Sequence, residues 1–300
     1  MGSPDPSAAG AGPRSEPAAA RTARRVSTAW LQLRLAVRNR LSRAPVTGDA
    51  DVVVSLTTYG PRLATAHHAV ESVGRGIVRP RRIVLWVGRA DAERLTPQLQ
   101  RLRRRGLEVV ATTDVGPHTK YHPYVMAHER HALPLATADD DVLYPRGWLA
   151  GLLTAYAEQP GVVSCYRAWE MVLDGDRLAP YATWPPCRTT TPAHRHFLTG
   201  VGGVLYPPAV LDALRRAGTG FLTLTRANDD VWLNVVALRH GVPVRQVVAR
   251  RTEFPVVLRS QRAGLYGQNV AAGRNDALLA AVYTDVDLAA LAADARGTPG

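Results

Sequence analysis

The sequence reads Thr137-Ala138-Asp139-Asp140-Asp141-Val142-Leu143-Tyr144-Pro145 near the middle of its 300 residues. Three adjacent carboxylates stand where an apolar segment ends and a helix-like segment, 148–158, is about to begin. Adjacent anions repel one another and raise each other's pKa values, so a chain tolerates them most readily where a cation binds. Hard divalent ions prefer such carboxylate oxygens. The alternative is an acidic turn that caps the next helix, because Asp is favoured at helix starts.

On both sides of this stretch, short β-branched runs alternate with helix-like segments. The strand-like runs cover 51–57, 82–88, 107–111, 133–138, 162–166 and 242–248. The helix-like segments cover 63–73, 90–105, 121–132, 148–158, 208–217 and 231–240. This alternation predicts an α/β fold whose mostly parallel sheet carries helices on both faces.

The position of the acidic triplet favours a binding site over a simple cap. In an open α/β sheet, ligands bind outside the carboxyl ends of the parallel strands. The loops after 51–57, 107–111 and 133–138 all leave the sheet at that edge. The polar residues of these loops are therefore expected to share one crevice: Tyr59, Arg62, His118, Lys120 and Asp139 to Asp141.

Two later segments also carry candidate functional residues. Asn228-Asp229-Asp230 directly precedes the apolar run 231–238. Capping explains one such residue well, and three in a row less well. Gly200, Gly202 and Gly203 lie among apolar residues, where glycine allows backbone to approach a ligand or another strand closely. Bends of this kind are more often structural than functional.

The two ends of the chain differ from its body. Residues 1–20 are rich in Pro, Ala, Gly and Ser and are expected to be disordered. Residues 21–43 have the pattern of a basic amphipathic helix, which either lies on an anionic membrane surface or packs on its own domain or a second subunit. Residues 1–48 carry +6 of the net charge of +12. The sequence has no apolar run of about 18 residues and no leader-like start, so a cytoplasmic location, with peripheral contact at the inner face of the membrane through 21–43, is expected.

Taken together, four motifs resemble the metal-dependent GT-A glycosyltransferases, particularly bacterial family 2-like enzymes. They are Val53-Val54-Ser55-Leu56-Thr57-Thr58-Tyr59, the acidic stretch 138–145, Thr199-Gly200-Val201-Gly202-Gly203, and Asn228-Asp229-Asp230-Val231-Trp232-Leu233. The resemblance covers about residues 50–255. It implies one GT-A domain over 49–285, with a nucleotide-binding half at 49–145, a smaller mixed acceptor-side half at 146–255 and a C-terminal tail at 286–300.

The resemblance also implies roles for individual residues. Asp139 and Asp141 of a DxD-type motif would hold Mn²⁺ or Mg²⁺ against the donor's diphosphate, and His240 is a third candidate ligand. Ser55, Thr57, Tyr59, Arg62 and Asp140 would bind the donor. Independently of the resemblance, Lys120, the only lysine of the chain, is expected to contact a phosphate as a compact charge, with chance as the alternative explanation for a single lysine. Gly200, Gly202, Gly203 and Trp232 would face the sugar or the acceptor. Asp229 or Asp230 would be the general base of an inverting transfer.

The expected activity is transfer of one sugar from a nucleotide-sugar to a sugar or glycolipid acceptor, in the synthesis of a polysaccharide or glycoconjugate. A sugar-nucleotidyltransferase is the nearest alternative, but residues 57–62 lack the glycine- and basic-rich signature that usually follows the first strand of those enzymes. A basic membrane- or nucleic-acid-binding protein without catalysis is the alternative from another class. No nucleic-acid partner is expected, because no recognisable binding motif is present.

Overall fold

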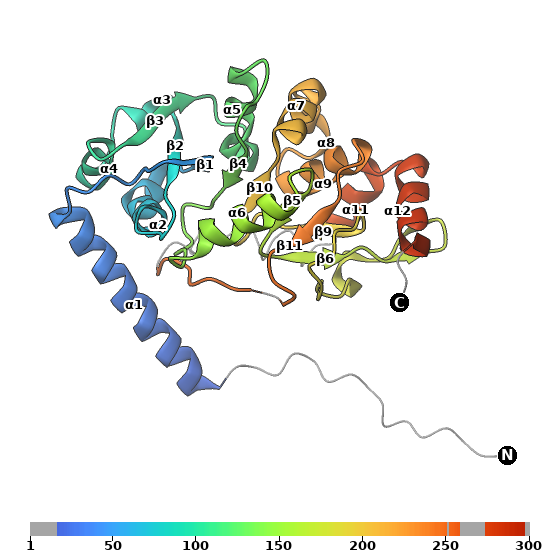
Figure 1. The fold of residues 1–300 in the computed structure, drawn as a ribbon, viewed down its shortest axis with the longest axis horizontal. Coiled ribbons are helices and arrows are strands. Elements are labelled where there is room, and N and C mark those ends of the chain that lie inside the picture. Colours follow the sequence, from blue (N-terminus) through green and yellow to red (C-terminus); the bar gives the residue numbers. More distant parts are fainter. Residues whose placement is uncertain (1–16, 251, 259–273, 298–300) are drawn as a thin grey trace.

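The computed structural model of the protein describes residues 17–250, 252–258 and 274–297. At its centre lies a seven-stranded sheet with the strand order β11-β5-β10-β4-β1-β2-β3 (Figure 1). In chain order these strands are β1 Ala50–Thr57, β2 Pro80–Gly88, β3 Leu107–Thr112, β4 Leu135–Thr137, β5 Val163–Cys165, β10 Val204–Tyr206 and β11 Val244–Gln246.

The sheet is mostly parallel, as expected. β1 pairs in parallel with β2 and β4, β2 with β3, and β5 with β11. β10 lies between β4 and β5 and is antiparallel to both. The loop that leads into β10 therefore emerges at the same edge as the loops that follow the parallel strands. The predicted α/β class is confirmed.

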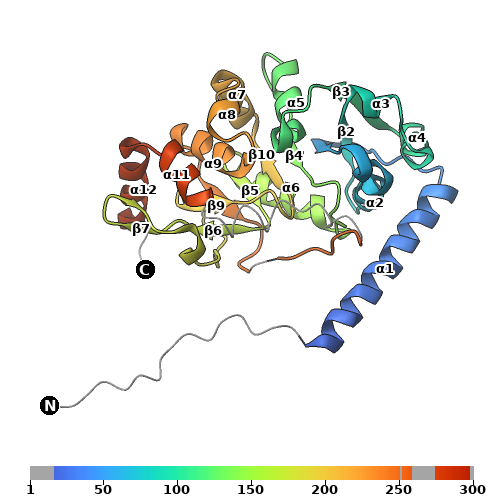
Figure 2. The same cartoon turned by 180° about the vertical axis from the view of Figure 1, so that it is seen from behind.

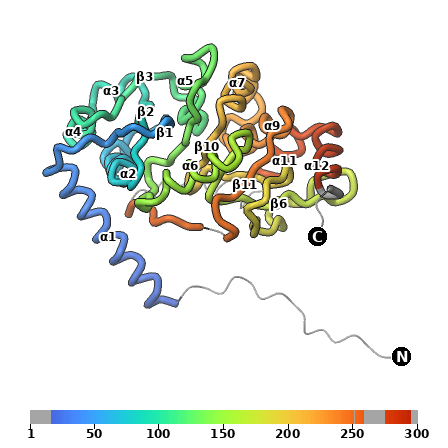
Figure 3. The backbone as a smooth tube through the Cα atoms, viewed as in Figure 1, coloured from blue at the N-terminus to red at the C-terminus, as the bar shows by residue number. Residues whose placement is uncertain are grey.

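Helices cover both faces of this sheet. In chain order they are α1 Ala18–Leu41, α2 Leu63–Gly74, α3 Arg89–Ala92, α4 Pro97–Arg103, α5 His122–Ala127, α6 Trp148–Glu158, α7 Pro208–Ala217, α8 Phe221–Leu224, α9 Asp229–Arg239, α11 Arg274–Val282 and α12 Asp285–Gly297. Two short sheets, β6 Ala168–Glu170 with β9 His196–Leu198 and β7 Leu173–Asp174 with β8 Arg177–Leu178, extend the half that contains α9. Figures 2 and 3 show α11 and α12 at the end of the molecule opposite to α1.

The alternation of side chains along β1 explains the two cores. Val52, Val54 and Leu56 belong to a cluster that includes buried side chains of α2, α4 and α6. Val53, between them, belongs to the second cluster, with residues of α5, α7 and α9. Successive side chains of a strand point to opposite faces, so a continuous apolar run is what a strand buried on both faces requires.

One expected helix is two helices. The segment 90–105 contains α3 and α4, because Pro97 has no backbone N–H to continue a helix but fits the first turn of a new one. The Thr96 hydroxyl caps α4 by accepting the N–H of Leu99 at 3.4 Å. The helix expected over 121–132 is also shorter and ends at Ala127.

The N-terminal helix α1 is held against the body by a buried carboxylate. Glu71 of α2 is fully buried, forms an ion pair with Arg105, and accepts hydrogen bonds from Asn39 and Arg38 of α1 at 3.1 and 3.2 Å. The expected helix over 21–43 is therefore found, and it packs on its own domain. Expected disorder at 1–16 lies outside the described residues, and at Ala18–Ala20 it is wrong because α1 has begun. Most of the tail expected at 286–300 is helical in α12.

Candidate active site

The loops after β1 and β4 meet as expected. The Thr58 hydroxyl donates a hydrogen bond to Asp140 at 2.6 Å. Nη2 of Arg62 lies 2.6 Å from one oxygen of Asp140 and 2.6 Å from one oxygen of Asp141. Two carboxylates of the acidic triplet therefore converge on one cation at the carboxyl edge of the sheet.

Lys120 connects the acidic triplet to the second acidic pair. It lies in the short 3₁₀ turn Gly116–Lys120 after β3, and its Nζ is 2.9 Å from Asp139 and 3.3 Å from Asp229. The side chain is buried. Burial lowers the pKa of Lys120, but the carboxylates around it, Asp139 first, raise that pKa well above its usual value. Lys120 is therefore a cation at the pH of the cell, held between two segments that are ninety residues apart.

The three carboxyls of the triplet lie in different environments. Asp140 is buried, and burial raises its pKa to about 7 even though Arg62 and the Thr58 hydroxyl lower it. Asp141 is less buried, and burial with Asp139 nearby raises its pKa as well. Asp139 is the triplet member that faces Lys120, and its backbone N–H donates to the Tyr144 hydroxyl at 2.8 Å.

Asp229 and Asp230 stand at the first turn of α9, after Asn228. The Asn228 side chain accepts the N–H of Val231 at 3.2 Å, so the capping role belongs to Asn228 and leaves both aspartates for other contacts. Asp230 accepts the N–H of Gly200 at 2.8 Å. The glycine bend thus lies directly beside the second acidic pair.

Neighbouring charges separate the two aspartates of α9 in acidity. Burial raises the pKa of Asp229, but Lys120 and His118 lower it by more than burial raises it. The pKa of Asp229 therefore falls below its usual value. Burial and the adjacent Asp229 raise the pKa of Asp230 to about 7. Asp229 is therefore the ionised partner of Lys120, while Asp230 exchanges its proton near neutral pH.

The glycines of the bend allow close packing. Gly202 and Gly203 have φ angles of +93° and +95°, a region that favours glycine. A Cβ at Gly203 would lie 2.6 Å from the indole ring of Trp148, whose N–H donates to the carbonyl of Gly202 at 2.7 Å. Gly203 is thus explained by the packing of α6, and a Cβ at Gly202 would lie 3.3 Å from Tyr166. A Cβ at Gly200 would lie 3.3 Å from both Asp230 and Lys120, so only Gly200 borders the charged cluster.

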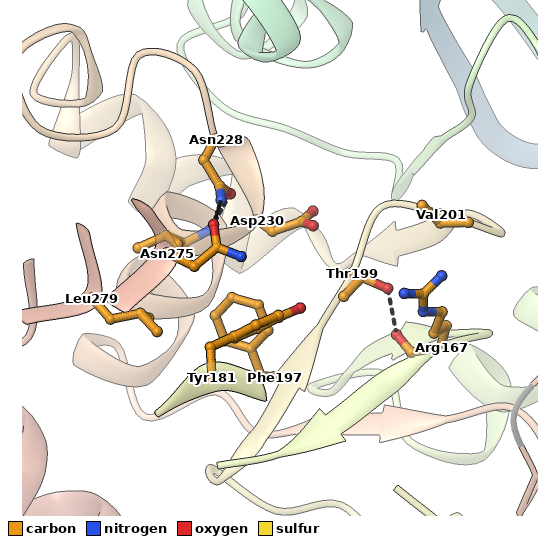
Figure 4. A pocket seen from close by; sticks show the side chains of 10 residues that line it. Arg167, Tyr181, Phe197, Thr199, Val201, Asn228, Asp230, Asn275 and Leu279 are labelled. Carbon is orange, nitrogen blue, oxygen red and sulfur yellow. Dashed lines mark hydrogen bonds between the residues drawn. The ribbon is translucent and has the colours of Figure 1, made fainter. Parts of the chain in front are cut away.

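A cavity of about 90 Å³ opens beside Asp230. Two aromatic rings, two asparagines and one arginine contribute to its lining: Tyr181, Phe197, Asn228, Asn275 and Arg167. Figure 4 shows the rings of Tyr181 and Phe197 side by side, with the Asp230 carboxylate and the Thr199 hydroxyl near them. The Asn228 amide donates to Asn275 at 3.1 Å, which ties α11 to the start of α9.

Some expected donor-binding residues lie where a ligand cannot reach their functional groups. The Ser55 hydroxyl is fully buried, donates to the Lys120 carbonyl at 2.6 Å and accepts the indole N–H of Trp86 at 2.9 Å. It fixes the Lys120 turn against β1, so both of its hydrogen bonds are made within the protein. The Thr57 hydroxyl donates to the Trp86 carbonyl at 3.2 Å. Tyr59 is 43% exposed, and the Arg62 guanidinium lies 5.7 Å from the centre of its ring.

Two further residues of the expected site, Trp232 and His240, lie away from the charged cluster. Trp232 is 5% exposed and packs against Phe221, with ring centroids 6.2 Å apart, so it belongs to the core and does not face a sugar. His240 follows the last turn of α9, on the order of 16 Å along the helix axis from Asp229. It is exposed there, and its Nδ1 lies 2.9 Å from the Val236 carbonyl. A metal ion near the triplet could not take His240 as a ligand.

The acidic triplet suits a hard divalent cation by its chemistry. Carboxylate oxygens are the ligands that Mn²⁺ and Mg²⁺ prefer, and those of Asp140 and Asp141 already converge on a positive nitrogen. A metal ion there would displace the Arg62 and Lys120 contacts, since both cations occupy the carboxylate oxygens. A different set of potential ligands has its ligand atoms within 4.8 Å of one another: Glu170 of β6, His196 of β9 and Cys187 of the loop beside them.

Comparison with known proteins gives structural likenesses only. No protein-family model and no curated protein matches the sequence. Among solved structures, the mannosyltransferase PcManGT from Pyrobaculum calidifontis, in complex with GDP-Man and Mn²⁺, has a TM-score of 0.45 and 15% identity, over 94% of this chain and 88% of that one. S. aureus TarS 1–349 has a TM-score of 0.48 and 16% identity, over 81% of this chain and 71% of that one. The 4-diphosphocytidyl-2C-methyl-D-erythritol synthase of Anaerococcus prevotii has a TM-score of 0.48 and 11% identity, over 72% of this chain and 98% of that one.

Several residues of this region escaped the sequence analysis. Arg167, Tyr181, Phe197 and Asn275 line the cavity, yet they come from four separate segments with no shared motif. Only Arg167 carried a usable signal, because it stands just after β5, at the edge where the other site loops emerge. The remaining three required the fold.

Proposed function

We propose that the protein is a glycosyltransferase that moves one sugar from a nucleotide-sugar to a hydroxyl group of an acceptor. The observation that carries this proposal is the position of Lys120, which lies within 3.3 Å of carboxylates from both acidic segments at the carboxyl edge of a mostly parallel sheet. Nucleotide ligands bind at this edge in open α/β folds. A cation among several anions is also what a site for a diphosphate and its metal requires.

In the proposed reaction Asp230 is the general base. The acceptor hydroxyl oxygen attacks the anomeric carbon, the bond from that carbon to the diphosphate breaks, and Asp230 takes the hydroxyl proton. A base is most effective when its pKa lies near the working pH, and the pKa of Asp230 is raised to about 7. Asp230 also lines the cavity, whereas Asp229 is paired with Lys120. A base opposite the leaving group corresponds to inversion at the anomeric carbon.

On the donor side, cationic groups of the chain would bind the diphosphate. Arg62 and Lys120 are the charged groups that would turn from the aspartates to phosphate oxygens. Asp139 and Asp141 would hold Mn²⁺ or Mg²⁺, which supplies Lewis-acid neutralisation of the charge on the leaving diphosphate. Asp140 would hold the β1 loop in place through Thr58.

On the acceptor side, the cavity suits a sugar. Tyr181 and Phe197 provide aromatic surface, and Asn228 and Asn275 provide amide groups for hydroxyls. Sugar and ligand sites commonly combine an apolar wall with a few polar groups in this way. The transfer would serve the synthesis of a polysaccharide or glycoconjugate.

The test is a panel of UDP-, GDP- and dTDP-sugars, each with and without Mn²⁺, in which release of nucleoside diphosphate is measured. We expect one donor to be turned over, and Asp139→Ala and Asp141→Ala to lower that rate by at least ~100-fold. The matched control is Asp51→Ala, which removes a carboxylate 67% exposed at the other end of β1. The proposal fails if no donor is bound or hydrolysed, or if pyrophosphate is released from a nucleoside triphosphate and a sugar phosphate instead.

We further propose that α1 places the enzyme on an anionic membrane surface. Five apolar side chains, 48–73% exposed, form one stripe along the helix: Val26, Trp30, Leu33, Val37 and Leu41. Residues 18–41 include six arginines and no acidic residue. A second copy of α1 would bring like charges together, whereas anionic lipid complements them. None of the helices in the described part of the chain has the length and apolar content to cross a bilayer.

Vesicle co-sedimentation tests this surface. The protein should sediment with vesicles that contain phosphatidylglycerol and remain in solution with pure phosphatidylcholine. Trp30→Glu should abolish sedimentation, and the control Val286→Glu, at an apolar residue 77% exposed on α12 at the opposite end of the molecule (Figure 2), should leave it intact. Equal sedimentation of Trp30→Glu, or a concentration-dependent dimer that Trp30→Glu dissociates, would contradict the proposal.

A further inference from the structure

Arg167 is a buried cation that pairs with no carboxylate of the described residues. It is the second residue after β5, is 7% exposed and lines the cavity beside Asp230. Within residues 17–250, 252–258 and 274–297, no carboxylate lies within 4.0 Å of its guanidinium, and its Nε has no hydrogen-bond partner. Burying a charge without a partner is costly, so proteins normally pair such groups or use them to bind a ligand.

Several shielded cations in the described part of the chain do have carboxylate partners. Arg105, which is 6% exposed, pairs with Glu71, and Lys120 pairs with Asp139 and Asp229. Arg62 pairs with two carboxylates of the triplet. Among the described residues, the less buried Arg75 also lacks an ion pair and has an Nε without a hydrogen-bond partner. Arg167 differs from Arg75 by its deeper burial and by its place at the cavity.

The neighbours of Arg167 fix its position beside the cavity. The guanidinium lies 5.5 Å from the centre of the Trp169 ring, an arrangement that supports the guanidinium and leaves its N–H groups available. The Thr199 hydroxyl donates to the Arg167 carbonyl at 3.4 Å, which fixes the backbone beside the cavity. Figure 4 shows the guanidinium next to Thr199 and Val201, on the opposite side of Thr199 from Tyr181.

We propose that Arg167 binds an anionic oxygen group, a carboxylate or a phosphate, on the acceptor, so that the enzyme glycosylates an acidic sugar or a phosphate-containing polymer. This inference rests on the proposed function. Arginine presents N–H groups in a planar fork that fits both anions. The group belongs to the acceptor because Arg167 and the base Asp230 line the same cavity, while Lys120 and Arg62 lie with the acidic triplet.

Matched acceptors test this assignment. The rate of transfer is compared for p-nitrophenyl glucoside, p-nitrophenyl glucuronide and the 6-phosphate of the glucoside, with the donor that the panel identifies. Wild type should favour at least one anionic acceptor over the neutral one by roughly 10- to 100-fold in kcat/KM, the range that a hydrogen bond to a charged group provides. Arg167→Gln should remove this preference and Arg167→Lys should keep part of it. The carboxylate and phosphate arms show which anion is bound.

Two outcomes would overturn the assignment. The first is that Arg167→Gln keeps the wild-type preference for the anionic acceptor. The second is that Arg167→Gln loses as much affinity for the donor as for the anionic acceptor, measured by calorimetry, which would place Arg167 on the donor side. Binding of p-nitrophenyl glucuronide and of the 6-phosphate, measured by calorimetry without any donor, keeps the test independent of the proposed reaction. If wild type bound neither more tightly than the glucoside, the assignment would fail even where a donor is turned over.

Thermal unfolding separates a ligand-binding role from a structural one. Because no carboxylate of the described residues pairs with Arg167, Arg167→Gln should leave the melting temperature unchanged or raise it. The matched control is Arg105→Gln, an arginine of similar burial whose partner Glu71 would be left behind, and it should lower the melting temperature clearly. An equal fall in both variants would show that Arg167 supports the fold and would contradict the proposal.

Discussion

At the scale of single residues, the account depends on how Lys120 and Asp229 set the acidity of Asp230. Burial is the largest cause of the raised pKa of Asp230, and the neighbouring anion Asp229 is the second. The base must be ionised to accept a proton, so kcat/KM of wild type should rise with pH and level off above about 7. Asp230→Asn should lower kcat/KM by about 10²- to 10⁴-fold, the range that general-base catalysis contributes.

The variant Asp229→Asn tests the direction of this coupling. Without the neighbouring anion, the pKa of Asp230 falls, and the rising limb of the pH–rate profile should move to lower pH. The profile of kcat/KM against pH in both proteins is the measurement. A limb that stays in place, or moves upward, would show that Asp229 does not act on the base.

Lys120 gives a second prediction at this scale. Lys120→Met leaves Asp139 and Asp229 without their shared cation, so affinity for the nucleoside diphosphate should fall by roughly 10- to 100-fold. Lys120→Arg should also bind more weakly, because Nζ already lies 3.3 Å from where a Cβ at Gly200 would stand, which leaves little room for a guanidinium. Calorimetry of nucleoside diphosphate binding measures both, with the exposed Arg177→Met as control. Unchanged affinity in both lysine variants would end the assignment of Lys120 to the donor site.

At the scale of elements, Glu71 determines how α1 is attached. Glu71→Ala leaves the buried Arg105 without its carboxylate partner, with only the Ala44 carbonyl as acceptor, and should lower the free energy of unfolding by about 3–5 kcal/mol. The control is Glu108→Gln, which breaks the half-exposed ion pair with Arg82 and should cost at most about 1 kcal/mol. Denaturant unfolding measures both. Equal losses would mean that the Glu71 cluster contributes no more than a surface pair.

The elements that were predictable are those with a clear pattern or a clear end. β1 and α6 show this, since an apolar run and a polar boundary define each. The break at Pro97 carried a signal, but the regular spacing of apolar residues through 90–105 concealed it. β9 and β10 are three residues each, and their pairing partners lie far away in the chain, so no local pattern could assign them.

At the scale of the whole molecule, the order of strands and helices in the sequence predicted which loops lie together at the carboxyl edge of the sheet. Arg62, Lys120 and the acidic triplet were expected in one crevice because parallel strands end at one edge, and the ion pairs between them place them together. The sequence could not predict which of the expected site residues are buried in the folded protein. Ser55 and Trp232 were assigned by their place in motifs, and His240 by a late histidine that some family members use. The first two are buried, and His240 is exposed at the far end of α9. The cavity beside Asp230 depends on α11 and on Tyr181, which only tertiary structure brings near.

The central claim is that two acidic segments ninety residues apart form one site around Lys120. A double-mutant cycle tests it most directly: donor turnover in Asp139→Asn, Asp229→Asn and the double variant. We predict that each single change lowers the rate by at least ~100-fold and that the double variant is only slightly slower than either, because both carboxylates act through the same cation. Losses that multiply in the double variant, or single variants as active as wild type, would contradict the account.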